Sequence, residues 1–110
     1  MHELALMESV VAAVEDEVRE GRVTRVRLEV GSLHAVVHDA LRFCFDVCTR
    51  GTRLEGAHLE IVEIPGRARC ERCGAERAID ALAMPSCACG SIDLRVVAGR
   101  ELRVPEVEVS

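Results

Sequence analysis

The sequence predicts an α/β (α+β) fold in which two helices pack on a small, mainly antiparallel sheet that a Cys-rich insert interrupts. Three observations lead to this prediction. Apolar residues recur at helical spacing in two segments, they alternate with charged residues in several others, and four of the six Cys gather between residues 67 and 90. At 110 residues, the chain has room for one small domain with a smaller module.

Two amphipathic helices are expected. The first covers residues 4–20 and can end at Gly21; the second covers residues 37–50 and can end at Gly51. Apolar positions in the first helix recur at three- and four-residue steps: Leu4, Met7, Val11, Val14 and Val18. The apolar side of the second consists of Val37, Leu41, Cys44, Phe45 and Cys48.

Strands are expected where apolar and charged residues alternate. One begins at Val23 and ends at Gly31-Ser32, and a second follows in "AHLEIVEI" until Pro65-Gly66. Near the C-terminus, "IDLRVVAGRELRV" predicts two strands joined by a turn at 98–100, and Pro105 places a bulge or a sheet edge in the last one. The expected domains are therefore an α/β body of residues 1–65, completed by 91–110, and an insert of residues 66–90.

Composition excludes several classes of protein. The 14 basic residues face 19 acidic ones, and the formal charge of −5 argues against binding to a nucleic-acid backbone. No apolar run is long enough for a transmembrane helix, and no secretory signal is visible, so the chain is expected to be cytoplasmic. Thiols stay reduced in that compartment, which favours metal ligation over disulfides.

The Cys-rich insert contains two closely spaced pairs. Cys70 and Cys73 form a C-x-x-C knuckle before Gly74, and Cys87 and Cys89 form a C-x-C pair before Gly90. Four thiolates around one Zn²⁺ give a closed tetrahedral shell, so a structural, zinc-ribbon-like domain is expected. Ser86 stands where the first Cys of the second knuckle would normally be, which makes Cys87 the least secure of the four ligands.

The N-terminal "MHE" offers nitrogen ligands. The Met1 amine, the backbone nitrogen and imidazole of His2 and the amide nitrogen of Glu3 can form a plane of four nitrogens, a geometry that suits Ni(II) or Cu(II). The alternative is an ordinary helix start, in which Glu3 is favourable near the positive end of the dipole. Three further pairs or single residues are expected to be structural or solvated: His34 with His38, Cys44 with Cys48, and His58.

In combination, "MHE", "FCFDVCTRGTRLEGAHLEI", the Cys pairs ending in "CGS" and the finish "VVAGRELRVPEVEV" resemble the HypA/HybF family of hydrogenase nickel-incorporation proteins. The resemblance covers nearly the whole chain. It implies a nickel metallochaperone, not an enzyme, that binds nickel through Met1, His2 and Glu3. The zinc ligands that it implies are Cys70, Cys73, Cys87 and Cys89.

The partners implied by this resemblance are the nickel-binding GTPase HypB and the large subunit of [NiFe]-hydrogenase; some family members also serve urease. Neither nucleic acid nor membrane is expected as a partner, and a weak homodimer is left open. The alternative interpretation is a zinc-ribbon module that binds nucleic acid or protein, which the Cys cluster alone would suggest.

Overall fold

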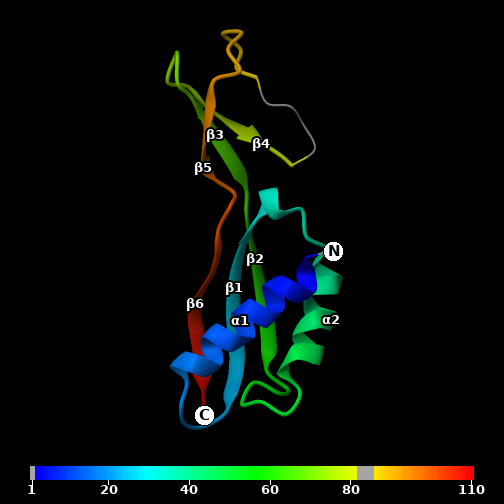
Figure 1. Cartoon of the computed structure of the whole chain (residues 1–110). Coiled ribbons are helices and arrows are strands. Elements are labelled where there is room, and N and C mark those ends of the chain that lie inside the picture. Colours follow the sequence, from blue (N-terminus) through cyan, green and yellow to red (C-terminus); the bar gives the residue numbers. More distant parts are fainter. Residues whose placement is uncertain (1, 82–85) are drawn as a thin grey trace. The chain divides into compact units, whose positions relative to one another are not determined.

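The structure is a computed structural model that describes residues 2–81 and 86–110 (Figure 1). Its elements are, in order, α1 (Glu3–Glu17), β1 (Val23–Gly31), the short 3-10 helix η1 (Ser32–His34), α2 (His38–Thr49), β2 (His58–Ile64), β3 (Gly66–Cys70), β4 (Glu76–Ile79), β5 (Leu94–Ala98) and β6 (Leu102–Val109). Two helices with small mixed and antiparallel sheets confirm the predicted fold class. Within the described residues, neither helix is long and apolar enough to cross a membrane.

The chain divides into two compact units. The first contains Met1–Glu29, Val36–Val62 and Arg103–Ser110, and the second contains Val30–Ala35 and Glu63–Leu102. The last strand of the chain thus belongs mainly with the two helices. The four clustered Cys all lie in the second unit.

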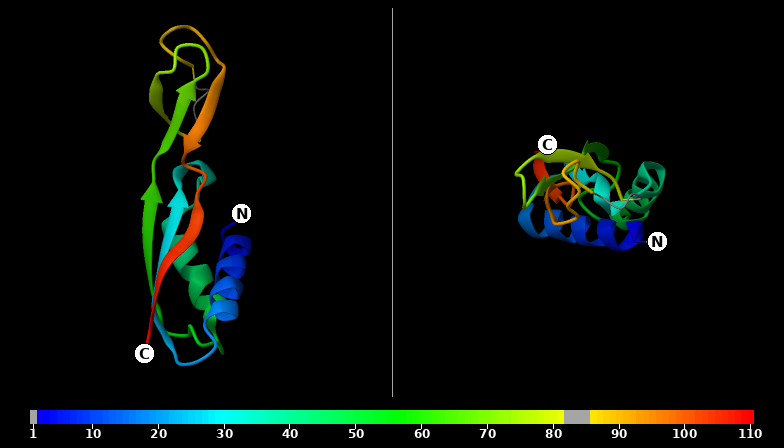
Figure 2. Two further views of the ribbon diagram at one scale, coloured as in Figure 1. Left: turned by 90° about the vertical axis from the view of Figure 1, so that its left-hand side faces the viewer. Right: turned by 90° about the horizontal axis from the view of Figure 1, so that it is seen from above.

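The first unit is built on a three-stranded sheet of order β2-β1-β6. β1 and β2 point the same way (Figure 2) and are joined by a crossover through α2, as parallel neighbours require. β6 runs antiparallel to β1, because the N–H of Ser110 donates to the carbonyl of Arg22 at the start of β1. Pro105 therefore lies on an edge strand, one of the two positions that the sequence predicted for it.

Both helices cover one face of this sheet and form the core of the first unit (Figure 1). Aliphatic side chains dominate this core, with Phe45 as its single aromatic ring. The largest fully buried side chains are Phe45, Met7, Leu28, Leu41, Leu54, Val23 and Val26. The predicted apolar stripe of α1 is correct for Met7, Val11 and Val14, but Leu4 remains 47% exposed.

The helices are slightly shorter than the periodicity predicted. α1 ends at Glu17, not at residue 20, because Val18 is already extended and residues 18–22 are needed to turn the chain into β1. Gly21 lies in that turn with a φ of +80°, a conformation that glycine adopts without strain. α2 begins at His38 and ends at Thr49, one residue inside each predicted boundary.

A charged network covers the other face of this sheet. Arg25 on β1 forms ion pairs with Glu60 on β2 at 2.7 Å and with Glu106 and Glu108 on β6 at 3.1 Å each. The hydrogen bond from Arg25 holds the pKa of the Glu108 carboxyl below its usual value. The polar residues of the alternating pattern therefore connect all three strands across the sheet.

The second unit is built on an antiparallel sheet of order β4-β3-β5. β5 was expected to return to the first sheet with β6, but it pairs with β3, with Arg69 opposite Arg95 and Cys70 opposite Leu94. The like charges of Arg69 and Arg95 are offset by Glu76 and Glu71, which pair with them at 2.6 and 3.1 Å. The two strands predicted from "IDLRVVAGRELRV" are thus present but belong to different sheets.

The two Phe residues of α2 should differ sharply in their effect on stability. Phe45 is 1% exposed and Phe43 is 66% exposed. We expect Phe45→Ala to reduce the free energy of unfolding by about 3–5 kcal/mol, whereas Phe43→Ala should change it by less than about 0.5 kcal/mol. Urea denaturation followed by circular dichroism measures both. Equal losses in the two variants would contradict the described core.

The charged network should contribute stability that depends on pH. Because its pKa is lowered in the folded state, Glu108 stabilises the fold above its unfolded pKa, and this contribution is lost as the pH falls through its folded pKa. Glu108→Gln should therefore lower Tm at pH 7, by a few degrees at most because the pair is exposed. The difference from wild type should vanish under strongly acidic conditions. Glu20→Gln is the matched control, and a difference that persists unchanged at low pH would refute the assignment.

Candidate metal centre

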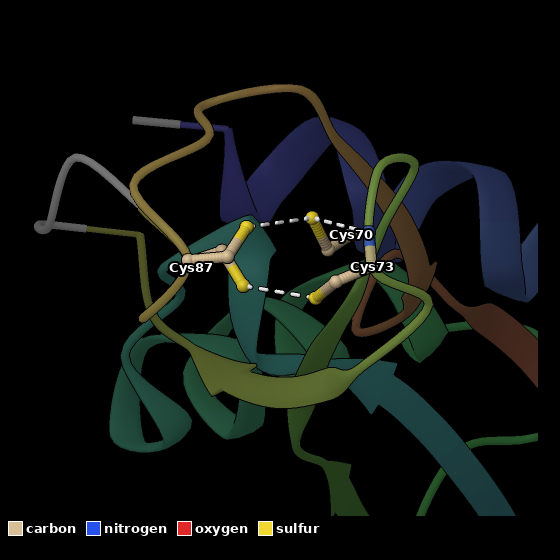
Figure 3. Close-up of side chains that lie close together, drawn as sticks. Cys70, Cys73 and Cys87 are labelled. Atoms are coloured by element: carbon tan, nitrogen blue, oxygen red, sulfur yellow. Dashed lines mark hydrogen bonds between the residues drawn. The ribbon is translucent and has the colours of Figure 1, made fainter.

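Four cysteine side chains come together in the second unit. Cys70 ends β3, Cys73 follows in the turn toward β4, and Cys87 and Cys89 lie in the segment before β5. The four sulfurs all lie within 4.8 Å of one another. Figure 3 shows Cys70, Cys73 and Cys87 pointing toward a common centre.

The spacing of these sulfurs fits a tetrahedral ion. The Sγ atoms of Cys70 and Cys89 are 3.7 Å apart, and those of Cys73 and Cys87 are 3.4 Å apart. With Zn–S bonds of about 2.3 Å, the edge of a regular tetrahedron is about 3.8 Å. A four-sulfur site of this size suits Zn²⁺ and leaves no ligand position for a substrate.

The two knuckles use the same hydrogen-bond frame although their Cys spacing differs. In the first, the N–H of Cys70 donates to the carbonyl of Ala75 and the N–H of Gly74 to the carbonyl of Cys70. In the second, the N–H of Cys87 donates to the carbonyl of Ser91 and the N–H of Gly90 to the carbonyl of Cys87. Cys87 thus has the position in the second knuckle that Cys70 has in the first. The second knuckle is one residue shorter between the bonded groups.

The second Cys of each knuckle also has an equivalent environment. The Sγ of Cys73 accepts from the N–H of Ala75, and the Sγ of Cys89 accepts from the N–H of Ser91, two residues further on in each case. This equivalence was not visible in the sequence, where Ser86 at the usual position of the first Cys made Cys87 the least secure of the expected ligands. The equivalence follows from the backbone hydrogen bonds of the second knuckle, which begin at Cys87 and not at Ser86.

The thiols differ in how readily they ionise without a cation. The N–H of Cys73 donates to the Cys70 sulfur at 3.4 Å and is the main reason that the pKa of Cys70 falls to about 6. For Cys89, the N–H of Ser91 lowers the pKa, but the adjacent thiols of Cys87 and Cys70 outweigh it and raise the pKa to about 11. For Cys73, the N–H of Ala75 lowers the pKa and the thiols of Cys87 and Cys70 raise it, and the net change is a rise. The Cys70 thiol therefore ionises more readily than those of Cys73 and Cys89.

The remaining Cys do not join a metal-binding group. Cys44 and Cys48 are half-buried on α2, and the pKa of Cys48 is raised, first by burial and then by Glu8. Among residues 2–81 and 86–110, the four-Cys group is the only set of three or more His, Cys, Asp or Glu side chains close enough to hold an ion. His34 places its Nε2 3.1 Å from the carbonyl of Arg100.

The N-terminal segment forms the beginning of α1 in the first unit. His2 is exposed and precedes the helix, and its carbonyl accepts the first helical bond from the N–H of Leu6 at 2.9 Å. Met1, also expected in this site, lies outside the described residues. The backbone nitrogens of His2 and Glu3 stand before the helical hydrogen-bond ladder begins, so a ligand could use them without breaking a helical bond.

The Glu3 carboxylate links the starts of the two helices. Its Oε2 accepts from the N–H of Val37, the residue before α2, at 3.2 Å. The N–H of Glu3 itself and that of Val37 hold the pKa of this carboxyl below its usual value. This contact between residues 34 positions apart was not predicted, because a backbone N–H leaves no signal in the sequence.

Comparisons with known proteins agree with one another. The family model described as HypA, "Hydrogenase/urease nickel incorporation, metallochaperone", matches residues 1–109. The hydrogenase maturation factor HypA of a Nostoc species is 49% identical over 99% of this chain and 96% of its own length. That of Geobacter metallireducens is also 49% identical and covers 99% of each chain. The solution structure of the Ni metallochaperone HypA from Helicobacter pylori has the same fold, with a TM-score of 0.70 at 22% identity over 99% of this chain and 97% of its own.

Because the two knuckles share the same backbone hydrogen bonds, we predict that Cys87 is as necessary for metal binding as Cys70. Co²⁺ serves as the probe, because a tetrahedral four-thiolate site gives intense sulfur-to-cobalt charge-transfer bands. We expect Cys87→Ser and Cys70→Ser to weaken those bands to the same degree, and both Ser86→Ala and Cys44→Ser to leave them unchanged. Full bands in Cys87→Ser would remove Cys87 from the ligand set.

Proposed function

This chain belongs to the HypA family of hydrogenase and urease nickel-incorporation metallochaperones, and from that membership we propose that it binds Ni(II) at its N-terminus and delivers it to a nickel enzyme under assembly. The observation that carries this proposal is the exposed start of α1. There the side chain of His2 is exposed, and the amide nitrogens of His2 and Glu3 precede the first helical hydrogen bond. Together with the Met1 amine, they make up the four nitrogens that a square-planar Ni(II) site needs.

Delivery requires a site that a partner can reach and empty. The nitrogen ligands belong to one short segment at the surface, so Ni(II) can leave without disrupting the core of the first unit. The Glu3 carboxylate has a separate role, because through Val37 it fixes the first turn of α1 against the start of α2. Glu3 thus contributes its amide nitrogen to the ion and its side chain to the position of the segment.

The four-Cys cluster is proposed to hold a structural Zn²⁺ through Cys70, Cys73, Cys87 and Cys89. Its donor set and its sulfur spacing support this assignment. Bound Zn²⁺ would supply a fixed tetrahedral link between the two knuckles, and a closed shell gives it no role in a reaction. In this proposal the chain is a carrier in the cytoplasm and not an enzyme.

The proposed partners are those of the family: the nickel-binding GTPase HypB, which would work with this chain, and the large subunit of [NiFe]-hydrogenase, which would receive the ion. The family description also includes urease.

Nickel titration by calorimetry tests the N-terminal site. The proteins are untagged wild type, His2→Ala and a variant with one residue added before Met1. Both variants should lose tight nickel binding, since one lacks the imidazole and the other moves the amine out of chelating distance. Their zinc content should stay at the wild-type value.

His34→Ala is the matched control, because His34 has no place in the proposed nickel site. It should bind nickel as wild type does. Equal nickel affinity in wild type, His2→Ala and the extended variant would overturn the terminal site.

A further inference from the structure

The outer side of α2 carries an aromatic residue that the fold does not use. Phe43 is 66% exposed, and Val47, one helical turn further on, is 38% exposed. The chain has only two Phe and neither Trp nor Tyr, and the other Phe is fully buried. Exposed aromatic side chains with an apolar neighbour are typical of interaction surfaces. We refer to Phe43 and Val47 as the α2 strip.

Two carboxylates of α2 lie beside this strip. On a helix, Phe43 has its closest surface neighbours at positions three and four residues away, and these are Asp39, Ala40, Asp46 and Val47. Asp39 and Asp46 are exposed and form no ion pair among the described residues. On the side toward α1, Glu8 lies close enough to Cys48 to affect its thiol. By the same rule, Val47 has the exposed Arg50 three residues further on, so the strip is an apolar centre bordered by two Asp and one Arg of this segment.

The charge of the first unit argues against a second copy as occupant. This unit has eight Arg against thirteen Asp or Glu, which gives a charge of −5, whereas the second unit has six of each. Two copies facing each other through α2 would bring together two units that each carry a charge of −5. Like charges across an interface oppose association, and opposite charges favour it.

We propose that the α2 strip is a docking site for a helix of a partner protein whose apolar side chains are flanked by Lys or Arg. Phe43 is the anchor and Val47 extends the apolar contact by one turn, in the manner of helix recognition through positions one turn apart. Asp39 and Asp46 favour a partner helix with Lys or Arg beside its apolar side chains, because opposite charges attract. The site requires no metal, so it does not depend on the proposed nickel chemistry.

Fluorescence titration with a designed peptide tests this site. The probe is an amphipathic helical peptide of about 18 residues, five turns, with Leu on one side, Lys on its borders and one Trp in its apolar side. Because the protein contains no Trp or Tyr, the emission reports on the peptide alone. Wild type should bind it saturably, and Phe43→Ser should bind at least about tenfold more weakly. The double variant Asp39→Asn/Asp46→Asn should bind more weakly than wild type at low salt only.

Two controls and one parallel measurement make the test decisive. Val97→Ser changes an exposed apolar residue of the second unit and should bind as wild type does. A peptide of the same composition with its residues rearranged should not bind. Equal binding of both peptides, or of wild type and Phe43→Ser, would overturn the proposal. A dimer in sedimentation that Phe43→Ser abolishes would also overturn it, in favour of a second copy. Nickel affinity should be the same in wild type and Phe43→Ser, which separates this site from the N-terminal one.

Discussion

Four sulfur atoms stand where the second unit would otherwise need a hydrophobic core. Its fully buried side chains are few and small, and they include Ala68 and Cys70. Backbone contacts fill the remaining space: a Cβ on Gly31 would lie 2.0 Å from the carbonyl oxygen of Gly99. A unit with so little apolar area gains most of its stability from a cross-link, and a metal ion is the one that reduced thiols allow. The proposed Zn²⁺ would supply that cross-link between β3, the two knuckles and β5.

The first unit does not depend on its ligands in this way. Its aliphatic core is complete without an ion, and its proposed nickel ligands come from one exposed segment before the first helical hydrogen bond. Removing an ion from there would disturb neither sheet nor helix, whereas removing the proposed ion from four converging thiolates would leave the second unit without its link. The two proposed ligand sets thus differ in how much folded structure depends on them, which suits the thiolates to a resident ion and the N-terminal nitrogens to a transient one.

Periodicity predicted both helices and most strands because their apolar faces are buried in the first unit. It could not assign β5, since the alternation of Leu94, Val96 and Ala98 is the same whether the strand pairs with β1 or with β3. It placed Leu4 in the core, although the structure leaves that side chain half exposed at the first turn of α1. The four Cys were found from their spacing. The equivalence of Cys87 and Cys70 could be seen only from the backbone hydrogen bonds. The N–H of Cys87 donates to Ser91 as that of Cys70 donates to Ala75.

The distribution of charge connects the two functions proposed for the first unit. Arg25 and its neighbours neutralise most carboxylates on the open face of the sheet, so the excess negative charge remains on the helical side. α1 has five acidic residues and no Arg, and α2 has two Asp and one Arg. A negative surface raises the local concentration of divalent cations and of cationic protein surfaces alike, over a range of about 10 Å at ordinary salt. The start of α1 and the α2 strip lie within this same helical layer (Figure 1), so one electrostatic feature favours the approach of both the ion and a basic partner.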